Sequence, residues 1–524
     1  METSPSQIHE HFMNPLFTDF YQITMTYAYW KAKRHEEHAV FEAFFRKCPF
    51  KGKFAVFAGL DEVLQFCKEF KFTPEQIAYL KGQMSHAEDE FFHWLENLDC
   101  SQLEVSGIPD GTIVFGKQPL LSLSGPVALV QLIETPILNL INFSTLLCTN
   151  AARMKIRSGP KVKCIEFGLR RAQGPNGGMT ASKYSYMGGF VGTSNVYAGM
   201  LNNIPISGTI AHSFIMSFDS EDDIKEQHYL DGTDIYARVK ELREELGWQD
   251  TNDSELYAFI SFATSYPDRF LALIDTYNTI NSGCKNFLLC AVVLSELGHN
   301  PVGVRLDSGD LSQLSKDCKK LFKEIGDKYG HDYSDLVVVA SNDINEKTIR
   351  QLNEDNHEID IFGIGTNLVT CQAQPALGMV YKLVEIEGKP RIKFSEEKEK
   401  VLIPGRKKVF RIFEGEHPSF DILTLEGEDD LQDGVSLTAY HPFNDDTKEI
   451  GSVTKAQKLT ESLFKDGESL IKQVDLKEKR EIVLQQIKSF DPAVVNTDEK
   501  EYTVYLSKKC KETFDSLLNS QSVE

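Results

Sequence analysis

The sequence lacks several features that would assign it to a specialised class of protein. Its ten cysteines are scattered and include no C-x-x-C pair, so neither a zinc knot nor a redox dithiol is expected. No apolar run reaches the roughly 18 residues that suggest a membrane span. The stretch from Met1 to Met13 lacks the apolar core of a signal peptide. We therefore expect a protein of the reducing cytosol that does not span a membrane.

Basic residues are outnumbered by acidic ones, 56 to 77. The 524 residues carry a formal net charge of −21, which argues against nucleic acid or an anionic membrane as a partner, because both would repel the surface. An anionic small substrate is still allowed if its site has its own arginines. With 41% hydrophobic and 25% charged residues, the composition is that of an ordinary globular protein, and the length predicts two or three domains.

The pattern of the chain changes twice. Residues 1–155 predict an N-terminal α+β domain, residues 156–378 alternate strands with helices, and residues 379–524 form a β-rich segment with helices. Within the middle segment the apolar spacing predicts amphipathic helices at 222–246, 285–297, 312–329 and 345–353.

Each strand predicted in the middle segment stops at polar residues or glycines. These strands cover 162–167, 204–207, 270–274, 302–306, 336–340 and 359–364. The distances between successive strand ends are those of single βα units. Apolar strands with polar C-terminal ends favour an irregular, TIM-like (β/α) barrel, whose active site is built from the βα loops. A doubly wound open sheet is the alternative.

The side chains at these strand ends suit a phosphorylated sugar. His212 follows a strand in a turn of small residues and is a candidate base, nucleophile or metal ligand, with a buried structural histidine as the alternative. Arg305 and Asp307 share a strand face, so they can hold an anion and a diol or metal, or form a structural ion pair. Asp275 is placed to bind ribose hydroxyls or Mg²⁺, or to cap a helix.

A Gly-Thr turn, Gly365-Thr366, follows the last of these strands. The run from Gly363 to Leu368 lacks the third glycine of a dinucleotide-binding motif, so it is a weak Rossmann signature. After a late barrel strand, the same turn offers backbone N–H groups and a hydroxyl to a phosphate, with a plain tight turn as the alternative.

Five motifs, in order, resemble those of the nicotinate phosphoribosyltransferase family. They are Phe17 to Gln22, Glu166 to Gly174, Gly208 to Ser213, Val304 to Asp310 and Gly363 to Thr366, and the resemblance runs from about residue 14 to beyond residue 500. It implies that nicotinate and 5-phosphoribosyl 1-pyrophosphate give nicotinate mononucleotide and pyrophosphate, coupled to ATP hydrolysis, as the first step of NAD salvage from nicotinate. It also implies a homodimer with active sites at the subunit interface, and a barrel accompanied by a second domain built from both chain ends.

The resemblance further implies roles for individual residues. ATP would transiently phosphorylate His212. Phe167 and Tyr21 would sandwich the pyridine ring, with Tyr21 supplied by the neighbouring subunit. Asp275 and Asp307 match contacts to ribose and to the Mg²⁺ (or Mn²⁺) pyrophosphate, directly or through water, and Gly365-Thr366 matches the 5-phosphate turn. The other substrate-binding positions implied are Arg170, Arg171, Thr209, Ser213 and Arg305.

Three alternatives stay open at this point. Relatives that use nicotinamide place an aspartate where this chain has Ser194; an aspartate there would repel the carboxylate of nicotinate, so Ser194 and the double arginine favour the acid. Enzymes that decarboxylate quinolinate are shorter chains. A catalytically silent scaffold is the third alternative, and the intact arginine, aspartate and histidine positions argue against it.

Overall fold

The computed structural model describes residues 13–226, 228–395, 397 and 400–520, so the stretch in which no signal-peptide core is expected lies almost entirely outside the described residues. The chain divides into two compact units. The first contains the chain up to Arg153, Gly174–Gly189, and the chain from Cys371 onward; the second contains Met154–Gln173 and Phe190–Thr370. The middle segment drawn from the sequence thus includes a stretch, Gly174–Gly189, that packs with the first unit. None of the described helices is long and apolar enough to cross a membrane.

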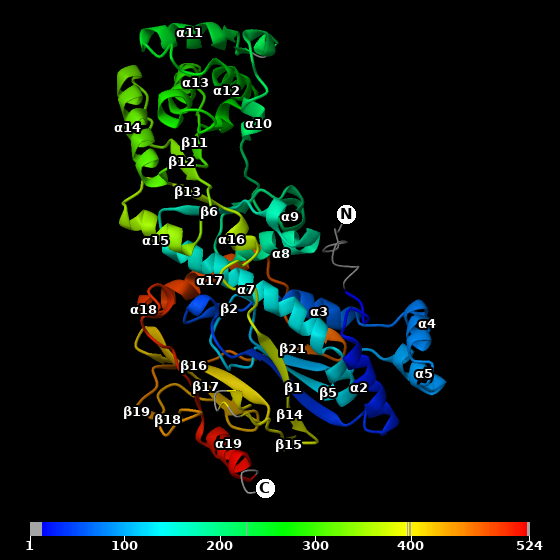
Figure 1. The fold of residues 1–524 in the computed structure, drawn as a ribbon. Helices are drawn as coiled ribbons and strands as arrows, with labels where there is room; N and C mark the ends of the chain where they lie inside the picture. Colours follow the sequence, from blue (N-terminus) through cyan, green and yellow to red (C-terminus); the bar gives the residue numbers. More distant parts are fainter. Residues whose placement is uncertain (1–12, 227, 396, 398–399, 521–524) are drawn as a thin grey trace. The chain divides into compact units, whose positions relative to one another are not determined.

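The second unit is built around a parallel sheet (Figure 1). Its spatial order is β10 (Leu271–Leu273), β11 (Gly303–Leu306), β12 (Val337–Ala340), β13 (Ile361–Ile364), β6 (Lys163–Glu166) and β7 (Gly192–Thr193). Each neighbouring pair is parallel. The C-terminal ends of all these strands therefore lie along one edge, where the loops that follow them meet.

Read from β6, the strands follow chain order as β6 and β7, then β10 to β13, and β13 pairs with β6 again. Within the described ranges, only the pairing between β7 and β10 is missing from a closed cycle. The predicted strand 204–207 is reduced to a single bridge, Ile206 to Thr193. The chain after this bridge contacts β10 through a side chain: Thr209 Oγ1 donates to the carbonyl of Leu271 at 2.6 Å. Pro205 has no N–H to donate to a ladder, which limits pairing here. Among the described residues no backbone ladder closes a barrel; the unit is a mixed α/β fold around an open parallel sheet.

Three helices of the second unit begin at polar residues that cap them. Asn252, Asp310 and Asn345 each accept a hydrogen bond from the backbone of the first turn of their helix. The helices of this unit are α9 (Val196–Asn202), α10 (His212–Ile215), α11 (Ile235–Glu245), α12 (Asp253–Ser265), α13 (Lys285–Glu296), α14 (Leu311–Tyr329), α15 (Glu346–Glu354) and α16 (Thr366–Val369). The helices predicted at 285–297, 312–329 and 345–353 are confirmed within one or two residues.

The helix predicted at 222–246 is wrong over its first half. A short hairpin of β8 (Tyr229–Leu230) and β9 (Thr233–Asp234) precedes α11. Its turn, Asp231-Gly232, has positive φ at both positions, 50° and 80°. An Asp-Gly pair favours this kind of two-residue hairpin turn, so the hairpin had a local sequence signal that the helical spacing obscured.

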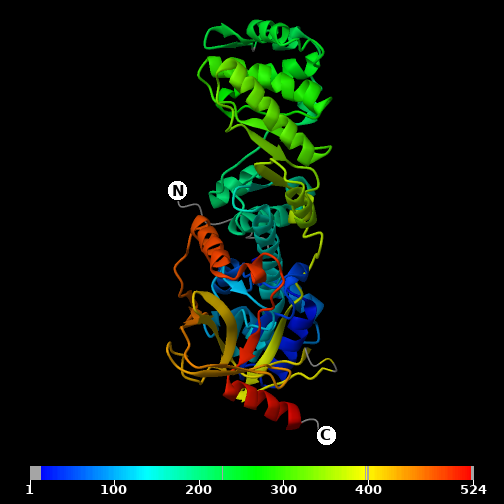
Figure 2. The same ribbon diagram turned by 90° about the vertical axis from the view of Figure 1, so that its left-hand side faces the viewer.

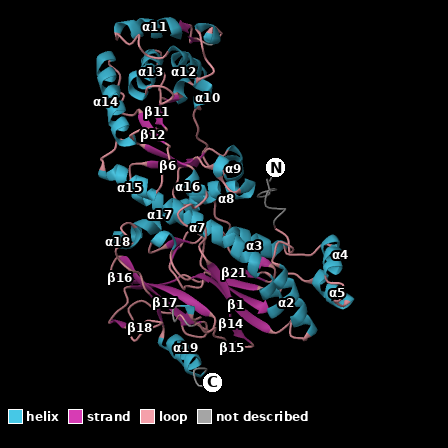
Figure 3. Ribbon diagram, in the orientation of Figure 1, coloured by secondary structure: helices cyan, strands magenta, loops and turns pink. Residues whose placement is uncertain are grey.

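The first unit contains two sheets dominated by antiparallel pairs, and Figure 3 shows longer strands here than in the second unit. One sheet has the order β15 (Lys389–Pro390), β14 (Met379–Ile386), β1 (His38–Phe45), β5 (Leu121–Pro126), β3 (Glu104–Gly107), β21 (Glu461–Lys465) and β22 (Glu468–Ser469). The other has the order β19 (Thr447–Ile450), β18 (Leu437–Tyr440), β23 (Val504–Leu506), β17 (His417–Leu425), β16 (Lys407–Glu414) and β20 (Lys455–Lys458). β2 (Ala55–Val56) pairs with β4 (Ile113–Val114).

Strands from distant parts of the chain pair in this unit. β1 lies between β5 and β14, so the N-terminal part and the part after residue 371 share one sheet. The helices are α2 (Phe20–Lys31), α3 (Leu60–Glu69), α4 (Pro74–Gln83), α5 (Asp89–Asn97), α6 (Val127–Leu132), α7 (Glu134–Ser158, whose last turn belongs to the second unit), α8 (Gly174–Met187), α17 (Leu476–Ser489), α18 (Pro492–Val495) and α19 (Lys508–Ser520). Figure 2 shows α19 at the C-terminal end of the described chain, beside the second sheet.

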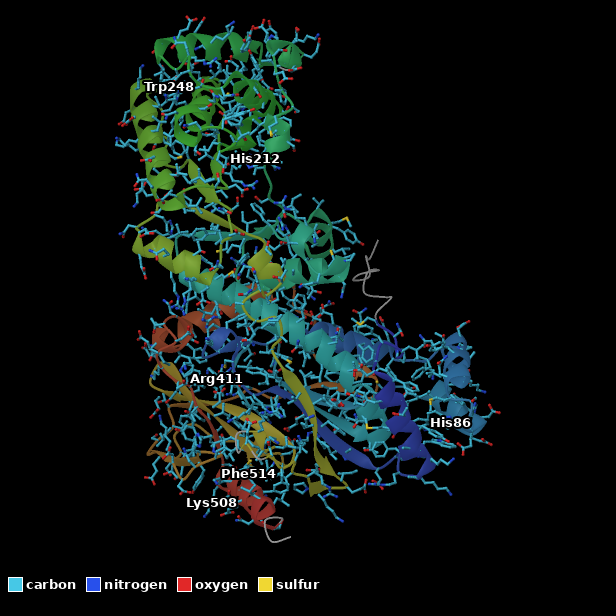
Figure 4. The ribbon with its side chains drawn as sticks, in the orientation of Figure 1. His86, His212, Trp248, Arg411, Lys508 and Phe514 are labelled. Atoms are coloured by element: carbon cyan, nitrogen blue, oxygen red, sulfur yellow. The ribbon has the colours of Figure 1, made fainter. Side chains whose placement is uncertain are left out.

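A buried ion pair joins two strands of the second sheet. Arg411 on β16 donates to both carboxylate oxygens of Asp421 on β17, at 2.9 and 2.8 Å, and both side chains are almost fully buried. The hydroxyl of Tyr502 also donates to Asp421, and the Arg411 guanidinium lies 4.9 Å from the ring centre of Phe490. Figure 4 labels Arg411 among the strands of this unit.

Removing one partner of this pair is expected to destabilise the first unit strongly. Asp421→Ala leaves the Arg411 guanidinium buried without its counter-ion, and we expect a loss of about 3–5 kcal/mol in the free energy of unfolding. Lys465→Ala, which breaks the exposed pair with Glu104, is the control and should cost under about 1 kcal/mol. Chemical denaturation followed by circular dichroism measures both. Equal, small losses would show that the buried pair is not a stability determinant.

Candidate active site

Two aspartates meet where β10 and β11 end. The backbone N–H of Asp307 donates to Asp275 Oδ2 at 2.9 Å, and the Ser308 hydroxyl donates to the same oxygen at 2.5 Å. Asp275 is buried, and its other oxygen, Oδ1, has no hydrogen-bond partner among the described residues. A buried carboxylate oxygen without a partner is costly, so a ligand or cation that occupies this position would satisfy it.

Arg305 and Asp307 belong to a polar group that includes one residue of the next strand end. The hydroxyl of Ser341, which follows β12, donates to Asp307 Oδ1 at 2.5 Å, and Arg305 Nε donates to the Ser341 hydroxyl at 2.8 Å. A third, longer contact joins Arg305 to Asp307 Oδ1 at 3.3 Å. One oxygen of Asp307 is thus held by its neighbours, and the other, Oδ2, faces His212.

His212 is the first residue of α10, and Figure 4 shows it on the segment that enters this helix. Its Nδ1 is 3.0 Å from the hydroxyl of Thr276, which follows Asp275. Its Nε2 lies 4.0 Å from Asp307 Oδ2, and 42% of the side chain is exposed. This exposure contradicts a buried structural histidine. The imidazole is instead oriented by Thr276, with Nε2 on the side of Asp307.

The loop after β6 places an aromatic ring beside this polar group. The Arg305 guanidinium lies 5.9 Å from the ring centre of Phe167, within range of a cation–π contact. A Cβ at Gly363 would come within 2.4 Å of the Phe167 ring, so only glycine leaves room for the ring there. The carboxylate of Glu166 is fully buried and accepts from the N–H of Gly168 and the hydroxyl of Thr193, which fixes the turn that carries Phe167.

The remaining predicted positions are less closely joined. Arg170 and Arg171 lie in the turn Leu169–Arg171 and are exposed, and Ser213 on α10 is exposed. Gly365 and Thr366 start α16, beside the Phe167 turn, because the N–H of Phe167 donates to the Ile364 carbonyl at 2.8 Å. Tyr21, on α2 of the first unit, is 49% exposed, so its ring is available to another molecule.

This region also contains three residues that were not assigned to the site from the sequence: Thr276, Ser341 and Glu255. Ser341 directly follows β12 and Thr276 follows Asp275, so their places near strand ends can be read from the sequence, but their hydrogen-bond partners cannot. Glu255 on α12 is fully buried, and burial raises the pKa of its carboxyl to about 7, with the negative charge of Asp275 adding to the effect. No local pattern distinguishes it from the other acidic residues of the first helical turn.

The two carboxylates can be compared with the ligands of a divalent cation that is completed by another molecule. The described residues contain no group of three or more histidine, cysteine, aspartate or glutamate side chains able to hold a metal by themselves. Mg²⁺ is commonly held by one or two carboxylates together with substrate phosphates and water. Asp275, with its unpartnered Oδ1, and Asp307, with its Oδ2 directed away from Arg305, fit this pattern.

Comparisons with known proteins agree with the arrangement. Family models described as the nicotinate phosphoribosyltransferase N-terminal domain, family and C-terminal domain match residues 16–142, 162–274 with 291–420, and 406–514. The chain is 46% identical to a nicotinate phosphoribosyltransferase of Dictyostelium discoideum, over 97% of this chain and 88% of that protein. It is 47% identical to one of Caenorhabditis elegans, over 91% and 88%.

A solved structure shares the fold. The crystal structure of human nicotinic acid phosphoribosyltransferase has a TM-score of 0.85 and 34% identity, covering 95% of this chain and 99% of that one. A nicotinate-nucleotide pyrophosphorylase from Pyrococcus furiosus, with a TM-score of 0.62 and 19% identity, shows similarity of fold alone. Together with the strand-end site, these matches show that the chain belongs to the nicotinate phosphoribosyltransferase family.

Proposed function

We propose that this protein transfers the phosphoribosyl group of 5-phosphoribosyl 1-pyrophosphate to nicotinate, giving nicotinate mononucleotide and pyrophosphate, with ATP as co-substrate. The observation that carries the proposal is the meeting of Asp275, Arg305, Asp307 and His212 at the strand ends of the second unit. A pyrophosphate leaving group, a ribose and an acidic base each find a matching group there. The reaction is the entry of nicotinate into NAD salvage.

The transfer itself needs little covalent help from the protein. The bond between C1 of the ribose and pyrophosphate breaks as the pyridine nitrogen approaches, so the sugar passes through a cationic state, and catalysis consists of alignment and charge stabilisation. Asp275 and Asp307 are placed to bind Mg²⁺ or Mn²⁺, which when bound neutralises the charge of the pyrophosphate. In this proposal the carboxylates flank the ribose, and Arg305, whose guanidinium lies 5.9 Å from the ring centre of Phe167, binds an anionic group of the substrate.

Substrate recognition is assigned from the family motifs and the exposure of each residue. The Phe167 ring supplies one face for the pyridine, and Tyr21 of the neighbouring subunit supplies the other. The exposed guanidinium groups of Arg170 and Arg171 attract the carboxylate of nicotinate. Further substrate contacts are assigned to Thr209 and Ser213, with the 5-phosphate at Gly365 and Thr366.

His212 is the group that links ATP to this site. Its imidazole attacks the γ-phosphorus of ATP, the bond to the ADP oxygen breaks, and ADP leaves with that electron pair. Water later hydrolyses the phosphohistidine to release phosphate. While the phosphoryl group is present, it adds negative charge and acceptor oxygens next to Asp307, which changes the affinity of the site for its cation and pyrophosphate.

Product analysis tests the proposed reaction. Purified protein is incubated with 5-phosphoribosyl 1-pyrophosphate and Mg²⁺, with nicotinate or nicotinamide, and with or without ATP; chromatography measures each mononucleotide and ADP. We expect nicotinate mononucleotide, formed faster with ATP, and little product from nicotinamide, because Ser194 offers the amide no carboxylate acceptor. A preference for nicotinamide, or no product from either base, would contradict the proposal.

The barrel and the dimer belong to the same proposal. We propose that the segment around Ile206 completes an irregular barrel between β7 and β10, and that the active protein is a cytosolic homodimer. An apolar surface supports an interface at α9: Val196 and Met200 lie one helical turn apart and are 66% and 69% exposed. Ile206, packed against Gly199 of the same helix, is 59% exposed. Exposed apolar groups that gather on one element commonly mark an interaction site.

A charge on this apolar surface is expected to break the dimer. Met200→Glu should shift the protein from dimer to monomer, weakening association by about 10²-fold or more, because an unpaired carboxylate would be buried in the interface. Analytical ultracentrifugation over a concentration series measures the shift. Leu470→Glu, on an exposed apolar residue of the first unit, is the control and should leave the dimer intact. An unchanged dimer in Met200→Glu would place the interface elsewhere.

A further inference from the structure

Glu255 belongs to a network of hydrogen bonds that joins α12 to the turn after Asp275. Its Oε2 accepts from the Ser282 hydroxyl at 2.6 Å and from the side-chain amide of Asn286 at 3.1 Å. The same amide donates to the carbonyl of Asn252 at 2.9 Å, and the backbone N–H of Asn252 donates to Ser282 Oγ at 2.9 Å. The N-terminus of α12 is thereby joined to the residues that precede and begin α13.

These bonds hold the turn that follows Asp275. Ser282 lies in a π-helical turn, Thr279–Cys284, and π-helical turns recur at functional sites. The turn is closed by the N–H groups of Ser282 and Gly283, which donate to the Asn278 carbonyl at 3.0 and 2.9 Å. Gly283 lies directly against the backbone of Ile274, since a Cβ there would come within 2.0 Å of the Ile274 carbonyl oxygen. Ile274 immediately precedes Asp275, so a shift of the π-helical turn moves that carboxylate.

The chemistry of Glu255 exceeds what packing of the helix requires. A fully buried carboxyl is costly, and its second oxygen, Oε1, has no partner in the described part of the chain. An apolar residue would satisfy the core at this position without that cost. The hydrogen bonds of the carboxyl do, however, hold the turn in place. This matters for catalysis because productive geometry at a reacting centre is lost by displacements of about 1 Å.

We propose that Glu255 is a positioning residue for Asp275, acting through Ser282 and the π-helical turn. It touches neither substrate nor cation. It fixes the position of the Asp275 carboxylate. The inference rests on the proposed function, in which Asp275 binds the ribose and the magnesium pyrophosphate. Asn286 and Ser282 form the other side of the same support.

A double-substitution cycle separates this role from a merely structural one. We expect Glu255→Ala to raise the KM for 5-phosphoribosyl 1-pyrophosphate by about 10- to 100-fold, with a smaller change in the KM for nicotinate. In the Asp275→Asn background, the same Glu255→Ala change should alter kcat/KM by less than about 3-fold, because the carboxylate that it positions is already gone. Glu255→Gln retains an acceptor oxygen for Ser282 and Asn286. Its KM for 5-phosphoribosyl 1-pyrophosphate should therefore stay within about 3-fold of the wild-type value.

The control is Ile260→Ala, a packing variant of the same helix whose side chain is fully buried. It should lower the melting temperature at least as much as Glu255→Ala and leave the KM for 5-phosphoribosyl 1-pyrophosphate unchanged. Equal effects of Glu255→Ala in the wild-type and Asp275→Asn backgrounds would overturn the inference, as would a KM shift of the same size in Ile260→Ala. If Asp275→Asn itself left turnover unchanged, the assigned function of Asp275 would fail instead, and the two failures are thus distinguishable.

Discussion

His212→Ala is expected to abolish the coupling of ATP hydrolysis to nucleotide formation. In the proposed mechanism the imidazole accepts the phosphoryl group, so its loss should lower steady-state ADP production during turnover on the order of 10³-fold or more. Nicotinate mononucleotide should still form slowly at high 5-phosphoribosyl 1-pyrophosphate, because Asp275, Asp307 and Arg305 remain in place. ADP and mononucleotide are measured in the same reaction, so the ratio of the two reports coupling directly.

The design of this experiment includes another histidine of the second unit. His299 lies 3.0 Å from Asp231 and 3.2 Å from Asp268, away from the strand-end site, so His299→Ala should leave the ratio of ADP to mononucleotide at its wild-type value. Acid-labile incorporation of phosphate from γ-labelled ATP should be lost in His212→Ala alone. If His212→Ala kept ATP-stimulated turnover, the phosphate acceptor would have to be another residue.

Asp307→Asn is expected to give the second large loss. The change keeps the shape of the side chain but removes the charge that faces His212 and partners Arg305. We expect kcat/KM for 5-phosphoribosyl 1-pyrophosphate to fall by about 10²- to 10³-fold, the usual effect of removing one preorganised charge from a reacting centre. The Mg²⁺ concentration needed for half-maximal rate should rise as well, because one of two carboxylates is lost.

Asp310 provides the matched substitution for this prediction, three residues along the same loop. Its side chain accepts from the backbone N–H of Gln313 at 3.0 Å and so caps α14. Asp310→Asn keeps a capping oxygen, and stability should change by under about 1 kcal/mol with little effect on turnover. If the Asp307 and Asp310 variants lost activity equally, the loss would reflect disturbance of the loop and not the chemistry of Asp307.

Local signals account for much of the second unit. Asp310, Asn345 and Asn252 precede apolar helical spacing, and each caps its helix, because a short polar side chain can bond the free N–H groups of the first turn. The parallel strands are short apolar runs that end at polar residues, and this pattern can be recognised without knowing the tertiary contacts. These features depend on neighbours within about four residues, so they can be predicted from the sequence.

Two elements were misjudged for physical reasons. The segment 204–207 was predicted to be a strand, but Pro205 lacks a donor, and the segment meets β10 through a threonine side chain instead of a ladder. The helical spacing of 222–246 hid the Asp231-Gly232 turn, whose backbone conformation at positive φ forms a hairpin. In each case one or two residues overrode the average preference of the surrounding window.

The family, the α/β character of the second unit and the candidate site residues could be read from the sequence alone, because motifs, caps and strand ends are local. Only the tertiary structure decided how these groups meet. The contact of His212 with Thr276 spans 64 positions, that of Asp307 with Ser341 spans 34, and that of Glu255 with Ser282 spans 27. Such pairings are set by the register of parallel strands and by helix packing, in which each hydrogen bond depends on the position of the whole sheet.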